Sequence, residues 1–344
     1  MADWLVITAD QPGVGRGVRG HALTWFLRTY LGRRAVVLRA PQQVGEEPLP
    51  RTEHLFVGLP TSLTSDGLRR LVAQAQPRRL VAFDYYDRHE LAWTMDQEQA
   101  FRESNALYFK PWHDPGWTYD LTMGLLPLRT NPRLAAAVAG DRLLRHIGWR
   151  PRPRYDVAFL GRPNRTRICV DGQIRKLDQR IDWLRELKRE APELKLWGGV
   201  THAPDPQDYS ANRRVPDISD LKFPQSSVGF FCYWRELRRA RVLLAPGGNA
   251  PWTYRHYECL YAGGVVATID FRKRDMLVPL PREGMVHVPD GEPVLPAVRQ
   301  AIELGQRRPQ LAEENFAHLE RYLRFGSYAR NRQLLLDRFL AQLR

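Results

Sequence analysis

The sequence predicts an α/β protein built from two Rossmann-like domains in tandem. Three observations support this prediction. Short apolar runs alternate with amphipathic stretches, a segment rich in proline and arginine at residues 148–154 interrupts the alternation, and 344 residues suit two domains of ordinary size. Apolar strands separated by helices form parallel sheets that helices cover on both faces.

The first half of the chain is expected to contain five strands and two helices. Each expected strand is a short apolar run, and each expected helix has apolar residues with a 3.6-residue period. The strands are expected at residues 4–8, 35–38, 54–58, 80–83 and 106–109, and the helices at 22–31 and 65–74. This half, residues 1–150, is the expected acceptor-binding domain.

The second half repeats the alternation after the interrupting segment. Residues 151–327 are the expected donor-binding domain, and a last helix within 328–344 is expected to pack back on the first domain. Strands are expected at 155–161, 194–197, 242–245, 265–269 and 285–288, and helices at 178–190, 233–240, 253–261, 295–304, 310–323 and 328–343.

The net charge points to an acidic partner. Lysine and arginine number 52 against 38 aspartates and glutamates, which gives a formal charge of +14. The surplus is +4 up to Arg150 and +10 after it. A nucleotide, a phosphorylated glycan, an anionic lipid surface and a nucleic acid would all satisfy such a charge.

Cysteine usage and hydropathy suggest a reducing compartment. The three cysteines, Cys169, Cys232 and Cys259, are far apart and form no C-x-x-C pair. The first residues lack the features of a secretory signal, and no apolar run is long enough to span a bilayer. We therefore expect a cytoplasmic protein without a transmembrane segment, and peripheral membrane contact stays open. The scattered histidines suggest no metal site.

The stretch from Ala245 to Val266 carries the clearest chemical pattern. A buried strand opens into Gly247, Gly248 and Asn249, a helix follows, and a second buried strand begins after two further glycines. The start of such a helix favours an anion, because its first N–H groups are unbonded. Arg255 and Glu258 lie one turn apart, so a cation for phosphate and a carboxylate for ribose hydroxyls would share one face.

The pattern Arg255-x-x-Glu258-x-Leu-x-Ala-Gly resembles the donor-site helix of GT-B glycosyltransferases, especially the exostosin-like and group 1-like ones. The resemblance implies that Glu258 binds the donor ribose and that Arg255, with Tyr254 beside it, lies at the diphosphate. Residues 159–167 resemble the first strand and loop of the donor domain in that family. This implies that the loop approaches the donor phosphates, with the candidate residues Gly161, Arg162, Arg165 and Arg167.

Two departures from the family refine the expected reaction. Retaining members often carry a second glutamate eight residues before the first, where this chain has Ala250. No Asp-x-Asp motif occurs either, which argues against a metal-dependent enzyme of the GT-A type. A metal-independent, inverting transferase is therefore expected, with protein cations and helix dipoles stabilising the leaving phosphate.

An inverting reaction needs a base for the acceptor hydroxyl, and the first domain offers candidates. Asp84 and Asp87 follow the apolar strand at 80–83, and Asp10 follows the first strand. A carboxylate at a strand end, beside aromatic residues, suits this role. His89 and His113 are weaker candidates for the base. Acceptor contacts are expected from the glycine loop and from two residues near the fifth strand, namely Gly13, Gly15, Arg16, Trp112 and His113.

The expected function is transfer of a sugar from a nucleotide sugar, a UDP-sugar first, to a glycan or lipopolysaccharide-type acceptor. The nucleotide sugar is a co-substrate, and no cofactor is expected. Two alternatives stay open. The chain is similar in length and charge to bacteriophage DNA β-glucosyltransferases, so the acceptor could be a base in duplex DNA. The second alternative is a non-catalytic nucleic-acid-binding protein. In such a protein the glycine loops and the Arg255–Glu258 helix would have no specific function.

Overall fold

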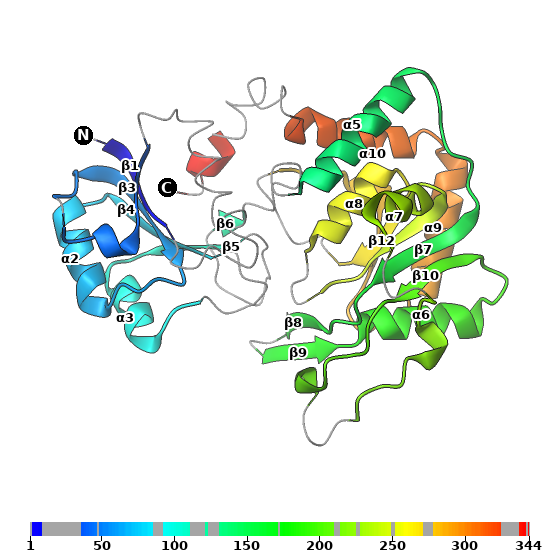
Figure 1. Cartoon of the computed structure of the whole chain (residues 1–344), viewed down its shortest axis with the longest axis horizontal. Helices are drawn as coiled ribbons and strands as arrows, with labels where there is room; N and C mark the ends of the chain where they lie inside the picture. The colour runs from blue at the N-terminus through cyan, green and yellow to red at the C-terminus, as the bar shows by residue number, and fades with distance from the viewer. Residues whose placement is uncertain are drawn as a thin grey trace. The chain divides into compact units, whose positions relative to one another are not determined.

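The chain forms two units, each built around a parallel sheet (Figure 1). The first comprises Met1–Thr130, Asp275–Pro279 and Tyr322–Arg344, and the second comprises Asn131–Arg274 and Leu280–Arg321. The division after Thr130 precedes the boundary expected at residue 150. The computed structural model describes residues 2–8, 36–46, 48–84, 92–110, 121–122, 131–170, 173–209, 214–224, 228–248, 252–270, 278–324, 337–341 and 343.

The first unit contains a six-stranded parallel sheet in the order β2-β1-β3-β4-β5-β6. Its strands are rich in aliphatic and aromatic residues, which suit a sheet covered on both faces. The bounds are β1 Ala2–Ile7, β2 Val36–Arg39, β3 Thr52–Leu59, β4 Arg79–Asp84, β5 Leu107–Lys110 and β6 Leu121–Thr122. The five strands expected in this half are therefore confirmed.

Two helices pack on one face of this sheet, α2 (Ser65–Ala75) and α3 (Met95–Glu103). Helix α2 begins where the hydroxyl of Thr64 accepts a hydrogen bond from the backbone N–H of Gly67. Helix α3, which sequence analysis did not predict, begins with a reciprocal cap between Thr94 and Gln97. The expected helix at 22–31 lies outside the described residues.

The opposite face of the first sheet packs against the C-terminal segment. The Phe339 ring stacks on Phe56 and contacts the rings of Trp4 and Phe109, with centroid distances of 6.0–6.2 Å. The backbone oxygen of Leu343 accepts a hydrogen bond of 2.8 Å from the Arg79 side chain. Residues 337–341 are helical, so the expected return of the C-terminus to the first sheet is confirmed for the described part of that segment.

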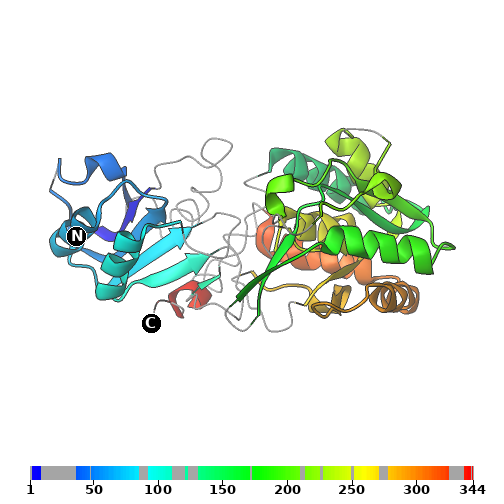
Figure 2. The ribbon, with the colours of Figure 1, turned by 90° about the horizontal axis from the view of Figure 1, so that it is seen from below.

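The second unit contains a five-stranded parallel sheet in the order β10-β7-β11-β12-β13. Helices α6 and α9 pack against each other, and α7 contacts both α8 and α5 (Figures 1 and 2). The strands are β7 Tyr155–Gly161, β10 Leu196–Val200, β11 Ala240–Ala245, β12 Val265–Ile269 and β13 Met285–Val288. The helices are α5 Pro132–His146, α6 Gln179–Glu190, α7 Phe230–Leu237, α8 Tyr254–Ala262, α9 Leu295–Arg307 and α10 Leu311–Leu323.

Several elements of the second unit differ from the sequence expectation. Helix α5 was not predicted. The stretch after β7 was expected to be a loop, but part of it forms an antiparallel hairpin of β8 (Thr166–Val170) and β9 (Gln173–Leu177). Strand β10 continues through the two glycines that were expected to end it, and α7 begins at Phe230. Single 3₁₀ turns occur at Pro41–Gln43, Pro206–Asp208, Ser219–Leu221 and Arg282–Gly284.

The α/β class with two parallel, Rossmann-like sheets is confirmed. In such sheets ligands bind beyond the carboxyl ends of the strands. None of the helices in the described ranges is both long and apolar enough to cross a membrane.

Candidate functional site

The candidate site lies at the carboxyl edge of the second sheet, where β7 ends at Gly161 and β11 ends at Ala245. Helix α8 begins after β11 and supplies Arg255 and Glu258 from its first two turns. The pair expected from the sequence is therefore positioned by two neighbouring parallel strands and the helix that connects β11 to β12.

A buried histidine fixes the start of α8. His256 is fully buried, and its Nδ1 accepts a hydrogen bond of 3.1 Å from the Thr253 backbone N–H. Its Nε2 lies 3.0 Å from the hydroxyl of Thr268, which itself donates to the carbonyl of Ala245. The hydroxyl must therefore accept from Nε2–H, and His256 is the neutral Nε2–H tautomer. The ring of Trp252 stacks on the imidazole at 4.2 Å.

Arg255, Tyr233 and Glu258 form one connected network. A guanidinium N–H of Arg255 donates to the Tyr233 hydroxyl, which donates to Glu258 Oε2 at 2.8 Å. Arg255 Nη1 also lies 3.6 Å from the same Oε2, and its Nη2 donates to the carbonyl of Leu160 at the end of β7. The network thus ties α8 to α7 and to the carboxyl end of the sheet.

The network leaves one carboxylate oxygen of Glu258 available. Both bonding contacts are to Oε2, and no group of the described chain hydrogen-bonds to Oε1. The Glu258 side chain is 13% exposed. Burial raises the pKa of Tyr233 well above its ordinary value against the charge of Arg255, and Glu258 adds to the rise. Tyr233 therefore stays protonated and donates, so Oε1 remains an acceptor for a ligand hydroxyl.

Gly161 gives Arg255 room at the end of β7. A Cβ atom there would lie 3.2 Å from the Phe159 ring and 3.3 Å from Arg255 Nη2. The guanidinium carbon of Arg255 lies 5.5 Å from the centre of the Phe159 ring, and that of Arg180, from α6, lies 6.0 Å from it. Two guanidinium groups therefore lie near one aromatic ring at this edge.

Arg180 joins the two glycine loops. Its Nε donates to the carbonyl of Gly247 at 2.9 Å, and its Nη1 donates to the carbonyl of Arg162 at 2.7 Å. A Cβ at Gly248 would lie 2.8 Å from Arg180 Nη2, and one at Gly247 would lie 2.3 Å from a methyl carbon of Thr166. A side chain at position 247 would therefore clash with Thr166, whereas one at position 248 would displace the end of the Arg180 side chain. The close approach at Gly247 brings the loop after β11 against the stretch after β7.

The remaining donor-side candidates occupy different environments. The Arg162 side chain is exposed beside the Arg180 contact, and Tyr254 is the first residue of α8. Arg165 is buried, with Nε 3.3 Å from Asp178 and its guanidinium carbon 4.9 Å from the centre of the Tyr209 ring. These contacts favour a structural use of Arg165. Arg167 lies on β8 rather than in a loop, and Asn249 lies outside the described residues.

The first unit contains one described candidate for the catalytic base, Asp84 at the end of β4. Its side chain is buried, and Oδ2 accepts a hydrogen bond of 2.9 Å from the backbone N–H of Ala92. The carboxylate therefore caps the return of the chain after β4. The other expected residues of this unit, Asp10, Asp87, His89, Gly13, Gly15, Arg16, Trp112 and His113, lie outside the described residues.

Sequence analysis missed two residues of this site, Tyr233 and Arg180. Neither belongs to the motif around Glu258, and each reaches the site only through the packing of its helix. Cys259, which follows Glu258, is buried, and burial raises the pKa of its thiol to about 12. The thiol is therefore protonated at neutral pH and packs rather than reacts.

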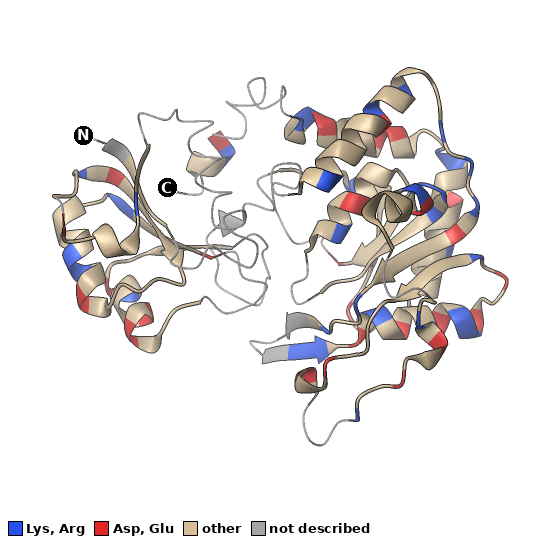
Figure 3. Cartoon of the chain, in the orientation of Figure 1, with Lys and Arg blue, Asp and Glu red and all other residues tan. Residues whose placement is uncertain are grey.

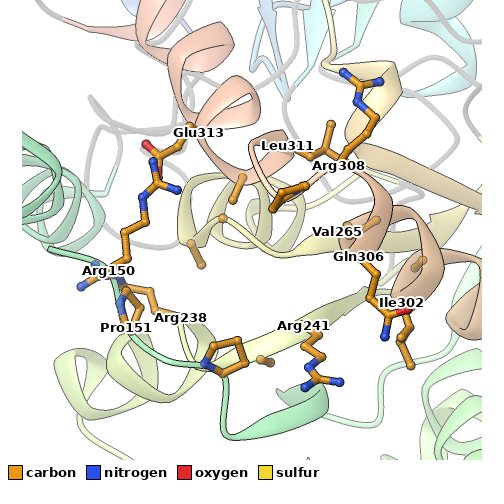
Figure 4. Close-up of a pocket in the computed structure, with 18 of the residues that line it drawn as sticks. Arg150, Pro151, Arg238, Arg241, Val265, Ile302, Gln306, Arg308, Leu311 and Glu313 are labelled. Carbon is orange, nitrogen blue, oxygen red and sulfur yellow. The ribbon is translucent and has the colours of Figure 1, made fainter. Parts of the chain in front are cut away.

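A separate pocket of about 360 Å³ lies at the amino edge of the same sheet (Figure 4). It adjoins the first residues of β11 and β12, Ala240 and Val265, and is therefore remote from the carboxyl edge. Its five arginines all have carboxylate partners: Arg145 and Arg150 pair with Glu313, Arg238 with Asp141, Arg241 with Asp156, and Arg308 with Glu283 and Glu314. The pocket is thus charge-balanced despite its arginines. In the described ranges, no cluster of three or more histidine, cysteine or acidic side chains could hold a metal ion.

No protein-family model and no curated protein sequence matches the chain. Several solved structures resemble it at low identity. The UDP complex of S. aureus MnaA is 10% identical, with a TM-score of 0.37 over 96% of this chain and 97% of that chain. Anabaena Alr3699/HepE with UDP is 11% identical, with a TM-score of 0.36 over 99% and 100%. The Neisseria meningitidis UDP-GlcNAc 2-epimerase bound to UDP-GlcNAc is 8% identical, with a TM-score of 0.36 over 98% and 99%.

Proposed function

We propose that this chain is a nucleotide-sugar-dependent glycosyltransferase whose second unit binds the nucleotide diphosphate of the donor. One observation carries the proposal: Glu258 is held at the carboxyl edge with Oε2 bonded to Tyr233 and with Oε1 available. A carboxylate that is oriented but only half satisfied suits two adjacent ribose hydroxyls, because the two lone pairs of Oε1 can each accept from one hydroxyl.

The neighbouring cations would bind the diphosphate. Arg255 and Arg180 lie near the Phe159 ring, and the exposed side chain of Arg162 follows the end of β7. These cations would stabilise negative charge on the leaving phosphate. Tyr233 would be a positioning residue, since it touches Glu258 and Arg255. Among nucleoside diphosphates, we expect UDP to be the one that this site binds.

In the proposed reaction an acceptor hydroxyl attacks the anomeric carbon of the donor sugar. The bond between that carbon and the phosphate oxygen breaks, the nucleoside diphosphate keeps the electron pair, and a base takes the hydroxyl proton. Asp84 is our candidate base, because it ends β4 with its carboxylate held by Ala92. Asp84→Asn should then lower transfer by about 100-fold and leave UDP affinity unchanged. Unchanged transfer by this variant would exclude Asp84 as the base.

Calorimetric titration with UDP tests the donor site. We expect wild-type protein to bind UDP and Glu258→Gln to bind it about 100-fold more weakly, because charge-assisted hydrogen bonds are lost. Glu236→Gln is the matched control, since Glu236 is buried to a similar extent and also accepts a hydrogen bond from a tyrosine. Equal UDP affinity for wild type and Glu258→Gln would overturn the proposal.

A further inference from the structure

Exposed hydrophobic side chains gather at the end of helix α5. Leu143, Ile147 and Trp149 are 65%, 67% and 48% exposed. Among the described residues the other large exposed hydrophobic side chains are Met95 and Phe231. Three of these five side chains thus fall within residues 143–149, which we call the α5 patch.

The patch continues a second apolar face of α5. Leu134, Ala137 and Val138 are buried on the face that packs inside the second unit. The outward face carries Ala136, Gly140, Leu143 and Ile147, which are all exposed and follow the helical period. A helix on the surface of a protein ordinarily has polar residues on its outward face. The apolar outward face of α5 therefore indicates a binding surface for another molecule.

Basic side chains adjoin the α5 patch. The connector from α5 to β7 carries blue, basic segments in Figure 3 and has Arg150, Arg152 and Arg154 at alternate positions between prolines. Lys195, which precedes β10, lines the same surface hollow as these arginines. We call these four residues the basic rim.

Most of the basic rim has no acidic partner. Arg150 pairs with Glu313, and Arg154 contacts the ring of Tyr155. Within the described chain, Arg152, Arg154 and Lys195 have no carboxylate partner. The neighbouring carboxylates Asp156 and Glu236 are already paired with Arg241 and Arg239. Three cations therefore remain available to an anionic surface.

We propose that the α5 patch and the basic rim dock the protein on an anionic phospholipid surface. Aliphatic and tryptophan side chains enter the boundary between headgroups and acyl chains, while arginine and lysine bind lipid phosphates. A nucleic acid would use the cations but has no counterpart for the aliphatic Leu143 and Ile147. The combination therefore favours lipid.

This docking surface lies at the amino edge of the second sheet, because the connector enters β7 at its first residue and Lys195 precedes β10. The candidate nucleotide site lies at the opposite, carboxyl edge. The inference does not depend on the proposed transferase activity, and its test requires no nucleotide.

Vesicle co-sedimentation with the full chain tests the proposal. We expect binding to vesicles of phosphatidylcholine with 30% phosphatidylglycerol, at least about tenfold weaker binding to phosphatidylcholine alone, and a loss of affinity at high salt. Equal binding to both vesicle types, or binding to neither, would overturn it.

Two matched pairs of variants separate this surface from overall charge and hydrophobicity. Leu143→Ser with Ile147→Ser should weaken binding by about tenfold, whereas Met95→Ser with Phe231→Ser should leave it unchanged. Reversal of three rim charges, R152E, R154E and K195E, should weaken binding by about 100-fold. Reversal of three exposed arginines of the first unit, R51E, R70E and R78E, should have much less effect.

Other partners of the surface give different results. If the apolar pair of substitutions leaves vesicle binding intact but converts a dimer into a monomer in light scattering, the patch contacts a second copy of the chain. If the charge reversal abolishes duplex DNA binding in a gel shift while vesicle binding persists, the rim binds nucleic acid. Either result contradicts the lipid proposal.

Discussion

Two tyrosine–glutamate hydrogen bonds involve residues of helix α7 that lie one turn apart, Glu236 and Tyr233, and they differ in how completely the carboxylate is satisfied. At the amino edge of the sheet, Glu236 receives Tyr155 on Oε2 at 3.1 Å and Arg235 on Oε1 at 2.7 Å. At the carboxyl edge, Glu258 receives Tyr233 on Oε2 and keeps Oε1 available. The side chains are exposed to similar extents, 10% and 13%.

The difference teaches that burial alone does not identify a binding carboxylate. Burial would raise the pKa of Glu236, but hydrogen bonds from Arg235 and Tyr155 bring it below its ordinary value. The Glu236 carboxylate therefore stays ionised, with both of its oxygens already hydrogen-bonded within the protein. Glu258 has fewer donors in a comparable environment, and a ligand can supply the rest. The same reasoning separates the charge-balanced arginine pocket in Figure 4 from the carboxyl edge.

The largest effect on stability should come from removing a buried ion pair at the amino edge of the second sheet. Arg238 and Asp141 form a buried pair at 2.8 Å, with side chains 7% and 3% exposed. Arg238→Ala leaves Asp141 without its countercharge, and we expect a loss of about 3–5 kcal/mol in the free energy of unfolding. Urea titration measures it. Arg241→Ala, which removes a half-exposed pair with Asp156, should cost less than about 1 kcal/mol.

If this edge is structural, UDP affinity of the folded Arg238→Ala protein should equal that of wild type. If Arg238→Ala instead lost UDP affinity while its stability stayed unchanged, the amino edge would take part in ligand binding and would not be purely structural.

The pH dependence of stability provides the next largest effect. Burial raises the pKa of Asp141 to about 6, against the charges of Arg238 and Arg145 and a hydrogen bond from Trp234. Between pH 4 and 6 the carboxyl ionises in the unfolded chain while it is still protonated in the folded one. Its contribution to stability is therefore complete below about pH 4 and is lost as the pH rises through 6.

The loss should be about 3 kcal/mol, the free energy that corresponds to the rise in the pKa of Asp141. The stability of wild type relative to Asp141→Asn, measured by urea unfolding at each pH, isolates it. A difference that stays flat from pH 4 to 7 would show that the pKa of Asp141 is not raised.

The sequence could predict most strands because each is a continuous apolar run with turn residues around it. It missed α3 and α5, although both have readable starts: Thr94 with Gln97 forms a capping box, and Asn131 caps α5 ahead of Pro132. The low apolar content of α3 and the two apolar faces of α5 hid the amphipathic period on which the helix predictions depended.

The candidate site was predictable where its residues share one motif. Arg255 and Glu258 lie one turn apart on α8, so their spacing brings them together. Tyr233 and Arg180 come from α7 and α6, and their approach depends on how these helices pack on the sheet. No local pattern encodes such long-range contacts. Arg165 is the opposite case. Its position in the sequence predicts contact with the donor phosphates, but its side chain packs between Asp178 and Tyr209, which no local pattern indicates.

The smallest expected effect is the one that bears most directly on the two tyrosine–glutamate bonds. Tyr233→Phe removes the donor to Oε2 and leaves Glu258 less firmly oriented, so UDP affinity should fall about tenfold. Tyr155→Phe removes the equivalent bond to Glu236, and UDP affinity should stay the same. Tyr155→Phe should lose about 1 kcal/mol of stability with its one hydrogen bond to Glu236, and Tyr233→Phe about 2 kcal/mol, because the hydroxyl of Tyr233 also accepts from Arg255. Calorimetric titration with UDP beside urea unfolding of both proteins makes the comparison. Equal losses of affinity would mean that the hydroxyl of Tyr233 stabilises the unit without positioning Glu258, whereas a loss confined to Tyr233→Phe assigns it the positioning role.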